Sequence, residues 1–136
     1  MKFEFLEHTA DLRFRAWGDS LDECFENCAR AMWSAVIRPD TVSTETEKKM
    51  EMEADSVEVL LHDFLSELLF AFETEGLVFR DFDVSIKDRG LSAVAKGERF
   101  DPKKHRIETE IKAVTYHEML IKEEKGEWSA TVLCDI

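Results

Sequence analysis

The sequence predicts an α+β fold in which two main helices pack on a mostly antiparallel β-sheet, within a single compact domain over residues 1–136. The chain begins with two segments of alternating apolar residues, two long helical patterns follow, and the second half shows consecutive strand patterns separated by short turns. Because the strands do not alternate regularly with helices, we expect antiparallel rather than parallel pairing.

Composition and charge limit the classes of partner. With 136 residues, of which 44% are hydrophobic, the chain is long enough to form a core without a disulfide scaffold. Its 30 acidic and 18 basic residues give a formal net charge of -12. Tight binding to phosphate backbones uses clustered Lys and Arg, and no such cluster is visible. We therefore expect no strong direct nucleic-acid binding, and instead a basic protein partner or a bound cation.

The apolar runs are short, and the cysteines are few. The longest uninterrupted apolar run covers residues 68–72, so the sequence predicts no membrane span, no secretory signal and a cytoplasmic location. Cys24, Cys28 and Cys134 form no C-x-x-C motif and lie among apolar neighbours. This pattern favours buried, reduced thiols over a disulfide or a zinc site.

The first elements are two strands and a helix. Residues 2–7 and 12–17 alternate apolar with charged side chains, and the polar sequence HTAD joins them. After them, Ser20 and Glu23 have the spacing of a capping box and begin a helical pattern that Pro39 ends.

A third strand and a second helix follow. Residues 44–54 alternate between methionines and charged side chains, as in a strand with a solvated outer face. Asp55 and Glu58 then repeat the capping spacing, and a wide apolar stripe runs to Gly76. This width predicts that the second helix is the central one.

The remaining chain has the pattern of strands alone. Turn signals such as Asp88-Arg89-Gly90 and Lys125-Gly126 separate the apolar segments. The expected strands are 77–88, 91–98, 106–114, 117–124 and 127–136.

Familiar catalytic motifs are absent from the sequence. It contains no dinucleotide-binding or P-loop glycine pattern, no serine-hydrolase elbow, no H-E-x-x-H and no EF-hand loop. The four histidines lie in separate segments, and Cys24 and Cys28 lie on the apolar stripe of a helix, where core packing is the better interpretation.

Three polar constellations remain as candidate sites. Asp11 could present two oxygens to a hard cation with His8 in support, although the pattern alone favours an Asx turn. At the other end, Asp135 and the α-carboxylate of Ile136 are adjacent anions that a divalent ion or a lysine would balance, or else they simply lie at the surface.

The third constellation is the segment IKAVTYHEM. Here Lys112, Tyr116 and His117 could face a common site, or could lie on the exposed face of an ordinary strand. Acid–base catalysis by Tyr116 and His117 has weak support, since no nucleophile can be identified beside them.

In their order along the chain these segments resemble one family. EHTADLRFRAWG, SLDECFENCARAMW, ETEGL, KAVTYHEM and the terminal ATVLCDI are together similar to the archease family over essentially the whole sequence. The resemblance implies an accessory protein, not an enzyme, that activates the RtcB-type tRNA-splicing RNA ligase. Archeases promote guanylylation of that ligase and allow multiple turnover.

The resemblance also implies a metal site. The family's ligands match Asp11, Asp135 and Ile136, and the lysine that the family associates with function matches Lys112. Oxygen donors suit calcium first, with magnesium or manganese as alternatives. His8 is assigned a supporting role. The competing interpretations are a stand-alone metal-dependent hydrolase that uses Asp11, His8 and His117, and an acidic, chaperone-like interaction module.

Overall fold

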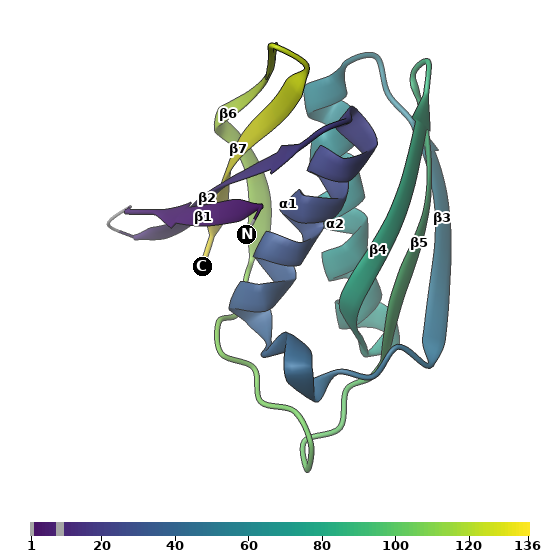
Figure 1. Ribbon diagram of the computed structural model, residues 1–136. Helices are drawn as coiled ribbons and strands as arrows, with labels where there is room; N and C mark the ends of the chain where they lie inside the picture. The colour runs from purple at the N-terminus through teal and green to yellow at the C-terminus, as the bar shows by residue number, and fades with distance from the viewer. Residues whose placement is uncertain (1, 8–9) are drawn as a thin grey trace.

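The computed structural model describes residues 2–7 and 10–136, and it has two helices between two antiparallel sheets (Figure 1). The helices are α1 (Leu21–Val36) and α2 (Val57–Glu75), with a short 3-10 turn, η1, at Pro39–Thr41. The strands are β1 (Phe3–Leu6), β2 (Asp11–Gly18), β3 (Thr46–Glu53), β4 (Leu77–Lys87), β5 (Gly90–Arg99), β6 (Ala113–Glu124) and β7 (Glu127–Asp135).

The strands divide into a larger and a smaller sheet. The larger sheet has the order β1-β2-β7-β6, and the smaller has the order β3-β5-β4. All pairs are antiparallel. The α+β prediction is confirmed, whereas the division into two sheets on opposite sides of the helices was not predicted. No helix in the described part of the chain is long and apolar enough to cross a membrane.

The helix ends follow from local chemistry. The Ser20 hydroxyl accepts a hydrogen bond from the Glu23 N–H, 3.1 Å away, as the capping-box spacing predicted. For α2 the expected cap Asp55 is wrong, because the Ser56 hydroxyl accepts from the Val59 N–H instead. Gly76 ends α2 in the left-handed conformation at φ 70°, which glycine adopts without a side-chain clash.

Aromatic rings join the helices to each other and to the smaller sheet. Phe25 of α1 and Phe64 of α2 stack with centroids 6.1 Å apart, and Trp33 packs edge-on against Phe72 of α2 and Phe79 of β4. Trp33, Phe25, Phe64 and Phe79 are at most 2% exposed. Both helices are therefore fixed by packing between the sheets, and neither depends on helix propensity alone.

The segment after β5 differs from the prediction. Residues 106–112 form no strand, and apart from an isolated bridge between Ile37 and Ile107 they run as an extended connection. The two expected strands 106–114 and 117–124 are replaced by one strand, β6, with a large bulge. Four residues of β6, 116–119, lie opposite Val132 alone, and Glu118 has a positive φ of 57° within this bulge.

The two edges of the smaller sheet have different surroundings. Along β4, the backbone N–H groups of Val84 and Ile86 donate to the carboxylates of Glu26 and Asp22 on α1, at 2.8 and 2.9 Å. Edge β3 lies on the other side of the sheet and borders a groove beside α2. Thus α1 covers one edge, and the other is open.

Candidate functional site

The antiparallel pairing of β2 with β7 brings two aspartates together. Asp11 begins β2, Asp135 ends β7, and the two residues are direct partners in the register. Directly opposed residues in such a pair point to the same face, with Cβ atoms about 5 Å apart. Residues 124 positions apart in the numbering thus bring their carboxylates to one end of the larger sheet.

Lys112 and Ile136 lie at the same end. The Lys112 N–H donates to the main-chain oxygen of Asp135 at 2.8 Å, just before β6 begins to pair with β7. Ile136 follows Asp135 directly and is 43% exposed. The structure therefore brings together Asp11, Lys112, Asp135 and Ile136. His8 lies outside the described residues.

The thiol beside these carboxylates is buried and points the other way. Cys134 pairs with Leu12 on the core face of the sheet. Burial, together with the negative charges of Asp135 and Asp11, raises the pKa of the Cys134 thiol to about 12. Because Cys134 faces the core, its thiol is not placed to join the two carboxylates on the other face of the sheet. All three cysteines are free and buried, which confirms that part of the prediction.

Arg13 is a neighbour of the site that the sequence interpretation missed. It lies two residues from Asp11 on the same face of β2, diagonal to Asp135 across the pair. Its Nε is buried and has no hydrogen-bond partner among the residues that the structure describes. A guanidinium at this place is a second source of positive charge for the two aspartates, beside any metal ion. The alternation of DLRF could have indicated it.

The ligand atoms available at this end of the sheet determine which cations it could bind. Within residues 2–7 and 10–136, no group of three or more His, Cys, Asp and Glu side chains is placed to hold a metal ion. A cation at this end would thus depend on two carboxylates completed by main-chain oxygens of Ile136 and by water. That set suits a hard ion such as calcium and does not suit zinc.

The third predicted constellation does not converge. The ring of Tyr116 stacks on the imidazole of His62 of α2, with centroids 4.1 Å apart. His117 is an exposed residue of the β6 bulge, where its Nε2 lies 3.9 Å from the Glu118 carboxylate. Only Lys112 of this segment belongs to the acidic end, which we define as Asp11, Lys112, Asp135 and Ile136.

The fold and the acidic end together define a class of protein. It is a small acidic α+β protein with two helices between antiparallel sheets and with paired aspartates where its first long strand meets its last. The model of the Archease protein family matches residues 3–136. The chain belongs to the archease family.

Individual relatives agree with this assignment. The chain is 44% identical to "Protein archease" of Methanosarcina mazei, covering 99% of this chain and 96% of the relative. It is 43% identical to "Protein archease" of Pyrococcus abyssi, covering 99% of each.

Two solved structures are similar to this one. The solution structure of protein 1598 of Methanobacterium thermoautotrophicum superposes with a TM-score of 0.87 at 40% identity, covering 99% of each chain. The crystal structure of "an archease, possible chaperone" from Thermotoga maritima has a TM-score of 0.66 at 22% identity over 96% of this chain and 94% of that one, and shows the shared fold alone.

Proposed function

We propose that this archease is a non-enzymatic accessory protein that activates an RtcB-type tRNA-splicing ligase in the cytoplasm. In this role it promotes guanylylation of the ligase and so allows repeated rounds of RNA joining. Family membership over residues 3–136 supports the accessory role. The observation that carries the proposal for this chain is the pairing of Asp11 with Asp135 beside Ile136.

The acidic end is the part that would act. Asp11 and Asp135 would hold a divalent cation, calcium first, with main-chain oxygen from Ile136. The bound ion would supply the positive charge that lets this anionic surface approach a phosphate-binding active site. The chain's own residues would position such an ion: the pairing of β2 with β7 holds the two aspartates side by side, and the Lys112 N–H holds the main chain of Asp135.

A ligation assay with the cognate ligase and excess RNA, with and without this protein, tests the proposal. We expect multiple turnover only when the wild-type protein is present. Asp11→Ala and Asp135→Ala should each abolish the stimulation, and circular dichroism should show an unchanged fold. Asp40→Ala and Asp55→Ala remove the same charge from exposed positions elsewhere and should stimulate normally.

The metal is tested separately by calorimetric titration with calcium, magnesium and manganese. Wild-type protein should bind calcium, and the Asp11→Ala, Asp135→Ala double variant should not. Normal ligase stimulation by that double variant would overturn the metal-site account.

The two rival functions predict other results. A stand-alone hydrolase would turn over a phosphoester without the ligase and would depend on Asp11, His8 and His117. An acidic chaperone-like module would lose activity equally in the Asp40 and Asp55 controls, because net charge alone would matter.

A further inference from the structure

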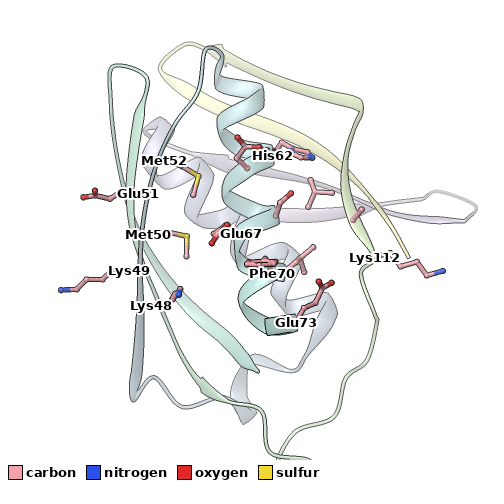
Figure 2. Close-up of a pocket in the computed structure, with 15 residues that line it drawn as sticks. Lys48, Lys49, Met50, Glu51, Met52, His62, Glu67, Phe70, Glu73 and Lys112 are labelled. Carbon is pink, nitrogen blue, oxygen red and sulfur yellow. Dashed lines mark hydrogen bonds and ion pairs between the residues drawn. The ribbon is translucent and has the colours of Figure 1, made fainter. Parts of the chain in front are cut away.

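A groove separate from the paired aspartates runs along the outer side of α2. It has a volume of about 750 Å³ and lies between edge strand β3 and the start of β6, with α2 as its floor (Figure 2). Its floor runs from His62 to Glu73. At 1.5 Å per residue this is about 16 Å, or three helical turns.

A short apolar strip lies within the otherwise polar and charged lining of the groove. Phe70 stands on the exposed side of α2, where 55% of its surface is open to solvent. Met50 and Met52 extend from β3 toward α2 inside the groove, whereas Lys49 and Glu51 extend away from it (Figure 2). Met50 is only 8% exposed and belongs to the core, so Phe70 and the partly buried Met52 form the accessible apolar strip. An exposed ring beside an adaptable methionine is typical of a surface that binds another protein.

The charges within the groove are negative and largely uncompensated. Glu67 and Glu73 line it, and neither forms an ion pair with a basic side chain among the described residues. Of the lysines, Lys48 is already paired with Glu75 at 2.7 Å, and Lys112 extends away from the groove in Figure 2. A partner that contacts Phe70 would therefore be attracted by positive charge on its flanks.

The edges of the groove are poorly suited to an added strand. Lys48 points inward from β3, and inward charges on an edge strand oppose strand addition. On the opposite side, the four-residue bulge at 116–119 interrupts the edge of β6. Because α2 forms the floor between the two sheets, an occupant of the groove would continue the helical layer that separates them.

Within the molecule, α1 already shows how a helix lies along an edge of this sheet. Its side chains at Asp22, Glu26 and Arg30 follow one another at intervals of four and reach the backbone of β4 at Ile86, Val84 and Phe82. A helix in the groove would stand in the equivalent place at β3 and would extend the helical layer beyond α2.

We propose that this groove is the docking site for a basic amphipathic helix of about three turns from a partner protein. Apolar side chains at helical spacing would cover Phe70 and Met52, and Lys or Arg on the flanks would pair with Glu67 and Glu73. A second copy of this chain fits poorly, since its net charge is -12 and α1 and α2 are packed between the sheets. This surface goes beyond the proposed ligase activation and does not depend on it.

Two synthetic peptides test whether the groove binds a helix or a strand. They have identical leucine and lysine composition and are each about 14 residues long. One has leucines at helical spacing, and the other alternates leucine and lysine as a strand does. Fluorescence anisotropy should give at least about tenfold tighter binding for the helical peptide. Amide NMR shifts in labelled protein should concentrate on α2 and β3.

Matched triple variants test whether the helical peptide binds in the groove. Phe70→Ser with Glu67→Gln and Glu73→Gln should weaken binding of the helical peptide by at least about tenfold. The control changes are Leu120→Ser, at a residue 54% exposed, with Glu47→Gln and Glu53→Gln on the outer side of β3. The control should bind as the wild type does, and circular dichroism should show that both variants are folded.

Three results would overturn the proposal. Equal loss of peptide binding in both triple variants would mean that net charge alone attracts the peptide. Equal or tighter binding of the alternating peptide would mean that the peptide adds as a strand to an edge of the groove. Concentration-dependent dimerisation of the wild-type protein by sedimentation, abolished by the groove changes, would mean that a second copy occupies the groove.

Discussion

The two edge strands of the smaller sheet differ in whether another part of the chain covers them. At β4, α1 supplies two carboxylates that accept from backbone N–H groups, and the edge is covered from within the chain. Beside β3 lies an open groove with the inward Lys48, the exposed Phe70 of α2 and Glu67 of α2, which forms no ion pair among the described residues. Carboxylates of α1 thus stabilise one edge of the sheet, whereas carboxylates of α2 line an open groove beside the other.

The largest contrast is expected between two phenylalanines. Phe25→Ala removes a fully buried ring that stacks on Phe64 and should lower the free energy of unfolding by about 3–5 kcal/mol. Phe70→Ala changes an exposed ring in the groove and should cost less than about 0.5 kcal/mol. Urea unfolding followed by circular dichroism measures both. A large loss for Phe70→Ala would make the groove part of the core.

A second contrast compares Glu98, whose carboxylate accepts several hydrogen bonds, with Glu67, which forms no ion pair among the described residues. Burial raises the pKa of Glu98, but hydrogen bonds from Lys104, Ser43 and His105 outweigh it and lower this pKa from 4.5 to about 2. Glu98→Gln should therefore cost about 2 kcal/mol at neutral pH, a value reduced for the solvent exposure of Lys104.

The pH dependence gives the sign of this effect. Because the folded pKa of Glu98 lies below the unfolded value, wild type keeps its full advantage over Glu98→Gln above pH 4.5 and loses it as the pH falls toward 2. Denaturant unfolding at several pH values measures the difference. Glu67→Gln in the groove serves as the control and should change stability little at any of them.

The smallest of these contrasts concerns the edge that α1 covers. Asp22→Ala should cost about 1 kcal/mol and leave the Ile86 N–H without its acceptor. Faster hydrogen exchange at the Ile86 amide, with unchanged exchange at β3, would confirm that α1 covers only one edge. Equal exchange at both edges in the wild type would contradict the comparison.

Glu26 adds a pH test at the same edge. Burial raises the pKa of its carboxyl above 4.5, more than the hydrogen bond from the Val84 N–H lowers it. Wild type should therefore lose stability relative to Glu26→Gln as the pH rises above 4.5, the reverse of the behaviour at Glu98.

Local patterns explain which parts of the fold the sequence could predict. The Ser20 cap, the Gly76 end and the alternation in β2 depend on neighbouring residues, so each was visible in a short window. The strand expected at 106–114 failed over residues 106–112 because alternation alone does not provide a partner strand, and this segment has an isolated bridge to Ile37 and single backbone hydrogen bonds in place of a ladder. Ser56 replaced Asp55 as cap because the two residues compete for one position.

The residues of the candidate site were likewise predictable only in part. Asp11 and Asp135 could be identified as unusual residues, and the family resemblance joined them, but their direct pairing depends on the β2–β7 register. Arg13 could have been inferred from the alternation of β2, whereas the groove around Phe70 was missed because a side chain's neighbours across sheets and helices leave no mark in a linear pattern. For Tyr116 the sequence left open a common site or the exposed face of a strand; the residue is 52% exposed, and its stacking on His62 of α2 was not predicted.

The pairing of β2 with β7 has a consequence for how the molecule folds. The helices and the smaller sheet form from one continuous stretch of chain, whereas the larger sheet joins segments as distant as Arg15 and Thr131, 116 positions apart. Such distant contacts close slowly and are lost together in partial unfolding. Asp11 and Asp135 would thus meet only in a fully folded molecule, and a partly opened one would keep its helices while losing its acidic end.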